Sequence, residues 1–190
     1  MNWLGFAILA WFLLGLELGL KPALGLGPAG IAPSFVFPLL TLVAMSAPPA
    51  IVHWACLSLG VMLDLTFPIE LRDGKPPIVL LGPYALGSLL AGQLIVTMRG
   101  LMIRRNPLTL AFLCTCGYAV CQVVVVAIFT LRHATGTPLL WDAPEQLLAR
   151  LGSALYTGVL ALVMALALVP AAPWLGLHAA APRRFATRRS

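Results

Sequence analysis

Charged residues are scarce in this chain of 190 residues, because its 12 Lys or Arg and 6 Asp or Glu make up only 9% of it. A soluble domain usually has about a quarter of its residues charged and about half apolar. Here 61% of the residues are hydrophobic, and the mean hydropathy is +0.98. No polar stretch is long enough to form a separate soluble domain. The composition therefore predicts one all-α integral membrane domain and excludes an ordinary soluble enzyme.

Motifs for catalysis, metal binding and phosphate binding are also lacking. The four cysteines fall inside apolar runs, without His or Cys partners at ligand spacing, which predicts small buried hydrophobic side chains and no metal: Cys56, Cys114, Cys116 and Cys121. No Ser-His-Asp set or paired carboxylates can be assembled, so we expect no catalytic residue and no cofactor. Residues 1–20 have neither a basic start nor a cleavage site, which favours a retained first helix over a signal peptide.

Six apolar runs are candidates for membrane spans, since a bilayer core needs about 20 residues per helix. They cover roughly 3–20, 31–47, 50–67, 78–98, 108–131 and 147–169. The second run is short. Pro33 suits the first turn of its helix, and Pro38 would kink it, so a tilted, kinked or partly re-entrant segment fits. The third run carries His53 and Asp64 and is only marginally apolar, which predicts a place inside the bundle.

Orientation follows from the basic residues of the short loops. Seven arginines would share one side with the C-terminal tail, 178–190: Arg99, Arg104, Arg105, Arg183, Arg184, Arg188 and Arg189. The opposite side would hold five basic residues: Lys21, Arg72, Lys75, Arg132 and Arg150. This bias predicts that both termini are cytoplasmic. We interpret the basic tail, with Arg104 and Arg105, as an anchor to lipid headgroups and do not expect nucleic acid as a partner.

Small residues recur four positions apart, a spacing that lets helices approach closely in lipid. The pairs are Gly15 and Gly19, Gly87 and Ala91, Ser88 and Gly92, and Ala154 and Gly158. Packing inside the bundle is the preferred interpretation, and docking of a partner helix is the alternative.

Two carboxylates lie within the predicted spans. Glu17 precedes Lys21 by four residues, which favours an ion pair at the membrane interface over a functional acid. Asp64 lies near the predicted end of the third helix, where the helix dipole disfavours a negative charge, so we expect that helix capping does not explain it. We expect Asp64 to face inward and to accept hydrogen bonds from a neighbouring span or loop, with Tyr84, Arg72 and Lys75 as candidate donors. The alternative is a side chain that reaches the headgroup water.

One group of short motifs resembles a known family. "PSFVFPLLTLVAM" (33–45) is followed by "LGVMLDL", in which Gly60 precedes Asp64 and Leu65, and then by Leu81–Gly82 and the basic turn "MRGLMIRRNPL". This order resembles MreD, a membrane protein of the bacterial cell-wall elongation machinery, over residues 31 to 115. The segment between Asp64 and Leu81 is longer than the family pattern, which suggests an extra external loop. Pro33, Gly60, Asp64, Gly82, Gly87 and Gly92 are the structural or interaction residues that we single out.

The resemblance implies a non-enzymatic scaffold in the bacterial cytoplasmic membrane. Its expected partners are membrane lipid, the single-span protein MreC, and the polymerase, transpeptidase and MreB filament of wall elongation. MreD also resembles the six-helix substrate-binding subunits of energy-coupling-factor vitamin transporters, so such a subunit is the alternative function. The spans offer few polar groups for a vitamin pocket, which favours the scaffold. These groups are His53, Asp64, Gln93, Thr97, Gln122 and Tyr156.

Overall fold

A computed structural model describes residues 1–27, 30–68, 79–101, 106–135 and 142–177. Within these ranges the chain forms six α-helices and one isolated β-bridge, between Leu26 and Ile31. The helices are α1 (Trp3–Leu20), α2 (Val36–Ser46), α3 (Pro49–Thr66), α4 (Pro83–Met98), α5 (Pro107–Ala134) and α6 (Ala143–Ala171).

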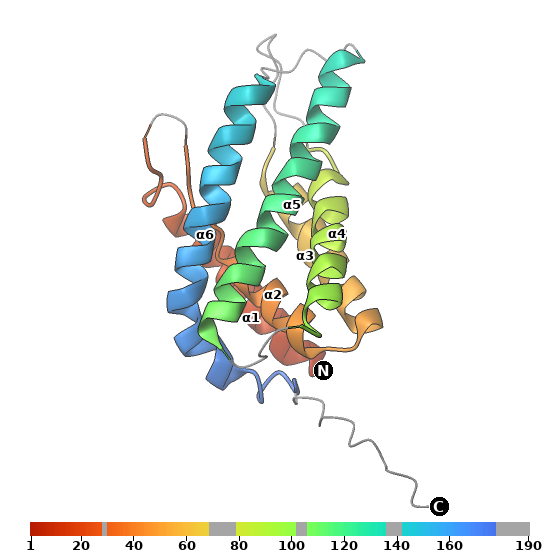
Figure 1. Ribbon diagram of the computed structural model, residues 1–190, viewed down its shortest axis with the longest axis vertical. Helices are drawn as coiled ribbons and strands as arrows, with labels where there is room; N and C mark the ends of the chain where they lie inside the picture. The colour runs from red at the N-terminus through yellow and green to blue at the C-terminus, as the bar shows by residue number, and fades with distance from the viewer. Residues whose placement is uncertain (28–29, 69–78, 102–105, 136–141, 178–190) are drawn as a thin grey trace, which may run out of the picture.

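Four of these helices, α1, α3, α5 and α6, are long and apolar enough to cross a membrane. The chain is therefore an all-α membrane protein. Helices α5 and α6 have 28 and 29 residues, so each is about 42–44 Å long and exceeds a hydrocarbon core of about 30 Å. They extend beyond the other helices at one end of the bundle (Figure 1). The two remaining helices, α2 and α4, are apolar but shorter.

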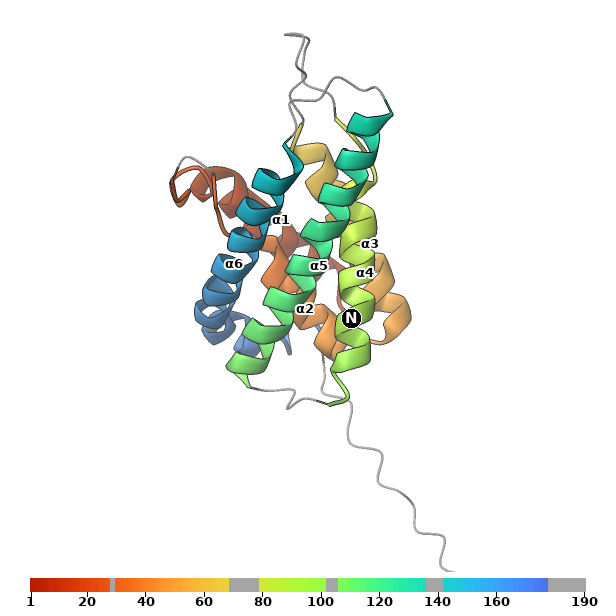
Figure 2. The ribbon, with the colours of Figure 1, turned by 45° about the horizontal axis from the view of Figure 1, so that its top comes forward.

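The short helix α2 is the centre of the molecule. It contacts all five other helices, and ten of its 11 residues are buried. Both views show it in the middle of the bundle (Figures 1 and 2). A helix of this length spans only about 16 Å, so both of its ends lie among other helices and need polar partners from them.

Two helices begin later than the predicted runs. Helix α2 begins at Val36, so Pro33 precedes the helix and does not occupy its first turn. Pro38 is the third helical residue, where no hydrogen bond within the helix is lost, and the predicted kink was wrong. Helix α4 begins at Pro83, after Gly82 adopts a φ of 129°, a backbone conformation that favours glycine.

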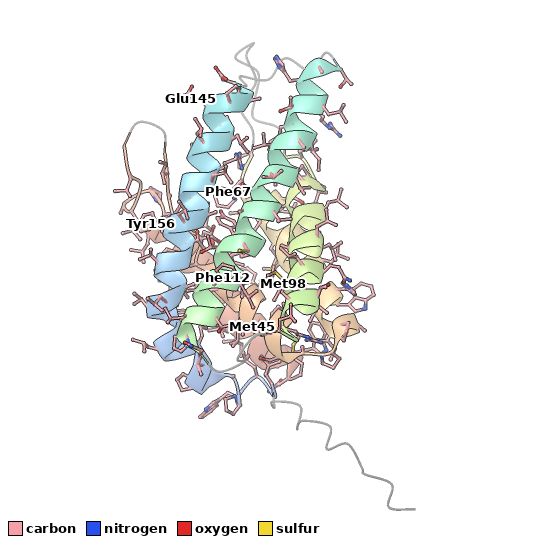
Figure 3. All side chains as sticks on the ribbon, viewed as in Figure 1. Met45, Phe67, Met98, Phe112, Glu145 and Tyr156 are labelled. Carbon is pink, nitrogen blue, oxygen red and sulfur yellow. The ribbon has the colours of Figure 1, made fainter. Side chains whose placement is uncertain are left out.

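Both ends of the described chain meet at one end of the bundle, which we call the lower end. The N–H of Asn2 donates to the carbonyl of Leu175 at 2.9 Å. The opposite end, called the upper end, holds the end of α5 and the start of α6 (Figure 1). Phe67 and Glu145 lie in the upper half, whereas Met45 lies in the lower half (Figure 3).

Glycines mark the closest approaches between helices. A Cβ on Gly60 of α3 would lie 2.6 Å from the Cα of Ala85 on α4, and one on Gly87 of α4 would lie 2.9 Å from the carbonyl oxygen of Cys121 on α5. A Cβ on Gly92 would meet the thiol of Cys56. In the same way, Gly158 of α6 packs against Thr115 of α5. Gly15 and Gly19 differ, because nothing lies within 4 Å of a Cβ added at either, so their packing inside the bundle was wrongly predicted.

The contrast between these glycines gives a first prediction. Gly60→Ala should lower the free energy of unfolding by about 1–3 kcal/mol, because the added methyl group meets backbone that cannot move aside cheaply. Gly15→Ala is the matched control on α1 and should be neutral or slightly stabilising. Thermal unfolding of the detergent-solubilised variants measures both, and equal stability of the two would contradict the close α3–α4 approach.

Candidate functional site

Glu17 of α1 holds the start of α2. Its side chain is 1% exposed. One oxygen, Oε2, accepts hydrogen bonds from the hydroxyl of Ser34 at 2.9 Å and from the backbone N–H groups of Phe35 and Val36, both at 3.1 Å. The other oxygen, Oε1, forms the predicted ion pair with Lys21 at 3.2 Å. The acid is therefore more than an interfacial ion pair, since it also serves as the cap of a neighbouring helix.

Every donor in the first turn of α2 is satisfied. The N–H of Phe37 donates to the hydroxyl oxygen of Ser34 at 3.3 Å, and Pro38 has no N–H to satisfy. At the other end of α2, Arg99 donates through Nη1 to the carbonyls of Ala44 and Ala47. A carboxylate at the N-terminus and a guanidinium at the C-terminus both match the helix dipole. These contacts allow a short helix to lie inside a membrane domain, where exposed backbone groups are costly.

Two hydroxyl groups of α6 hold the extended segment that leads into α2. Ser153 accepts from the N–H of Ala32 at 3.2 Å, and Thr157 accepts from the N–H of Ser34 at 3.0 Å. Alternate residues of an extended chain are about 6.6 Å apart, and residues four apart on a helix rise by about 6 Å, so the two spacings match. The segment therefore lies along α6, as the two ribbon views show (Figures 1 and 2).

Asp64 of α3 plays the same role for α4. It is 2% exposed. Its Oδ2 accepts from the N–H groups of Gly82 at 2.8 Å and Ala85 at 3.1 Å, and its Oδ1 accepts from the N–H of Tyr84 at 2.9 Å. Pro83 again has no donor. Asp64 therefore faces inward, and a side chain that reaches headgroup water does not fit this burial.

The capping role of Asp64 concerns the next helix and not its own. Sequence reasoning set capping aside because Asp64 lies at the C-terminal end of α3, but its negative charge lies at the N-terminal end of α4, where the dipole favours it. Tyr84 does donate to Asp64, but through its backbone. The other two candidate donors, Arg72 and Lys75, lie outside the described residues. Glu17 and Asp64 are thus two buried acids, each near the end of one helix and each capping the next.

A third polar cluster lies toward the upper end, around Arg150. Its Nη1 donates to the phenolic oxygen of Tyr84 at 3.0 Å and to Oε1 of Gln122 at 2.8 Å. Arg150 belongs to α6, within the predicted run 147–169, and is partly buried. The remaining polar pair, His53 and Gln93 at 2.9 Å, is exposed and lies between α3 and α4.

One cavity adjoins this cluster, and a second cavity adjoins the first. The first measures about 160 Å³ and is lined mainly by polar side chains: Lys21, Tyr84, Tyr118, Gln122, Gln146, Arg150 and Ser153, with Gly30, Ala32 and Ala149. The second measures about 440 Å³ and is lined by Glu17, Leu18, Lys21, Pro22, Gly25, Gly27, Gly30, Ala32 and Phe67. The two cavities share Lys21, Gly30 and Ala32. We call them together the outer cleft.

Several predicted site residues meet at one place and others do not. Gly60, Asp64 and Gly82 come together where α3 meets the start of α4. Gly87 and Gly92 lie further along α4 at its contacts with α5 and α3. Pro33 lies on the segment along α6. The arginines expected to anchor the chain lie outside the described residues: Arg104, Arg105, Arg183, Arg184, Arg188 and Arg189.

The part of the chain that the structure describes contains no group of three or more His, Cys, Asp or Glu residues suited to hold a metal ion. Cys56, Cys114 and Cys121 are buried, Cys116 is partly buried, and all four are free thiols. No protein-family model, curated protein or solved structure matches this chain.

Proposed function

We propose that this chain is a non-enzymatic scaffold of bacterial cell-wall elongation, as its resemblance to MreD implies. The observation that carries the proposal is the unit formed by Gly60, Asp64 and Gly82, which are the residues of the family-like motif. Gly60 permits the close approach of α3 and α4, and Asp64 binds the backbone at Gly82. A motif whose groups are engaged in positioning helices supports a structural role.

The surface of α1 supports a role in binding other membrane proteins. Only 22% of this helix is buried, and among the other helices α2 is its main contact. It exposes large apolar side chains, namely Trp3, Leu4, Ile8, Trp11 and Phe12. The open surface at Gly15 and Gly19 would let the single span of a partner such as MreC approach closely.

The proposed setting is the bacterial inner membrane, with six crossings and both termini in the cytoplasm. The backbone hydrogen bond between Asn2 and Leu175 supports an even number of crossings, since it joins the two ends of the described chain. The excess of arginine in the 99–107 loop and in the tail supports the cytoplasmic assignment.

Depletion of the protein tests this function. In a rod-shaped host, loss of the chain should give rounded cells, restoration of the chain should give rods again, and MreC should co-purify with it. Cell shape by microscopy and partner recovery by immunoblotting are the measurements. A substrate-binding transporter subunit is the second candidate, favoured by the outer cleft. Normal cell shape together with impaired vitamin uptake would establish that alternative and refute the scaffold.

A further inference from the structure

The outer cleft carries positive charge that the cell-shape proposal does not use. Among the described residues, its charged lining groups are Lys21, Arg150 and Glu17. Glu17 accepts from Ser34, Phe35 and Val36 through Oε2 and pairs with Lys21 through Oε1, so its single negative charge is engaged on both sides. Two basic groups against one acid leave these lining groups with one net positive charge, which favours an anionic ligand.

The polar cavity is arranged to bind an oxyanion. The contacts of Arg150 with Tyr84 and Gln122 fix the orientation of its planar guanidinium, which has five N–H donors. A phenol that accepts a bond from arginine still carries its own hydrogen, so Tyr84 adds a donor of the kind that oxyanions bind. Arginine is suited to phosphate because its fork of donors matches the phosphate oxygens.

The adjoining cavity has a different character. Beside Glu17 and Lys21 it has the apolar side chains of Leu18, Pro22 and Phe67, and its volume of about 440 Å³ lies within the range of ligand sites. Leu18 is 52% exposed on α1, so this cavity lies beside the apolar surface of the bundle. Lys21, which contacts Phe67 at 4.0 Å from its ring centre, lies where the two cavities meet. A cationic polar cavity joined to an apolar one fits an amphiphile.

We propose that the outer cleft binds an anionic lipid, with the phosphate of its headgroup at Arg150 and Lys21 and the first part of its chain along Leu18 and Phe67. Free phosphate shares the headgroup chemistry, but it would leave the apolar cavity unfilled. The proposal stands on the cavities alone and does not depend on the role in cell-wall elongation.

The test uses the full chain, purified in a neutral detergent and stripped of lipid. Thermal unfolding is measured with added phosphatidylglycerol, phosphatidylcholine or inorganic phosphate. We expect phosphatidylglycerol to raise the midpoint in a saturable way, and the other two to do so far less. An equal effect of inorganic phosphate would show a free-anion site and overturn the lipid assignment. An equal effect of phosphatidylcholine would show that the headgroup charge is irrelevant.

Variants locate the site. Arg150→Gln and Lys21→Gln should each weaken phosphatidylglycerol binding about five- to tenfold. Arg132→Gln removes the same charge from an exposed position at the upper end of α5 and should leave binding unchanged. Because Arg150 also contacts Tyr84 and Gln122, Ala149→Leu is a second test that keeps all charges and fills the polar cavity. If Ala149→Leu binds like the parent, or Arg132→Gln weakens binding as much as Arg150→Gln, the lipid lies elsewhere.

Discussion

Replacing Glu17 by leucine is expected to lower the free energy of unfolding by about 3–5 kcal/mol, although it makes α1 more apolar. The substitution removes the acceptor of Ser34, Phe35 and Val36 at the buried start of α2. It also leaves Lys21 without its ion-pair partner. Each buried donor that loses its acceptor costs about 1–3 kcal/mol, and water has little access to a side chain that is 1% exposed.

Glu17→Gln is the informative companion variant. All three donors at the start of α2 bind one oxygen, Oε2, while Oε1 faces Lys21. A glutamine whose amide oxygen takes the place of Oε2 can keep those three bonds. Its NH₂ group then replaces Oε1, so Lys21, which is 23% exposed, loses its ion-pair partner and turns to solvent. We therefore expect a loss of about 1 kcal/mol for Glu17→Gln, close to the value for Lys21→Met.

Unfolding in detergent and hydrogen exchange at the backbone amides of residues 35–37 are the measurements. Faster exchange there should accompany Glu17→Leu but not Lys21→Met, because only the first removes the acceptor. If Glu17→Leu is as stable as the parent, α2 does not depend on this cap, and the claim that Glu17 holds the start of α2 is contradicted.

The reason that sequence reasoning missed this role is that the cap is a tertiary contact. The run 31–47 has no charged residue and is mostly apolar, so hydropathy extends the second span five residues too far. The residue that caps α2, and so sets where the extended segment ends and the helix begins, is Glu17 of α1. A local signal was present, since Ser34 precedes Phe37 by three residues, the spacing of a side chain that accepts from the first turn of a helix. Pro38 belongs to that first turn as well.

The other helices differ in how far local sequence determines them. Helix α1 has the bounds of its predicted run, and α3 begins and ends one residue before its run. Both are apolar stretches bounded by polar residues or proline, so their limits can be predicted from the sequence. Helix α4 begins at Pro83 and not at 78, and the Gly82–Pro83 pair is the local signal for that start. The contacts of Arg150 were not predicted, because its partners, Tyr84 and Gln122, come from two other helices. No local pattern joins these three residues.

Asp64→Leu should be inserted into the membrane at least as well as the parent, since it removes a charge from α3. Its folded state should nevertheless lose about 2–4 kcal/mol, because the N–H groups of Gly82, Tyr84 and Ala85 lose their acceptor at the start of α4. The start of α4 would then shift relative to Gly60, and the proposed partner MreC should be recovered in smaller amounts.

Asp64→Asn should show that the two buried carboxylates, Asp64 and Glu17, bind their donors differently. Unlike Glu17, Asp64 uses both oxygens for backbone donors: two N–H groups bind Oδ2 and one binds Oδ1. An asparagine must place its own NH₂ group against at least one of these N–H groups, so it keeps at most two of the three bonds. We expect a loss of about 2 kcal/mol, milder than for Asp64→Leu but larger than for Glu17→Gln.

The comparison of these variants by membrane level, thermal unfolding and partner recovery decides the role of Asp64. We expect both variants to reach a normal membrane level. The unfolding midpoint should be lowest for Asp64→Leu, intermediate for Asp64→Asn and highest for the parent. If Asp64→Asn is as stable as the parent, the N–H groups at the start of α4 do not need both carboxylate oxygens as acceptors. If Asp64→Leu also folds and binds partners like the parent, the carboxylate does not hold the start of α4, and the motif that contains it has no structural role.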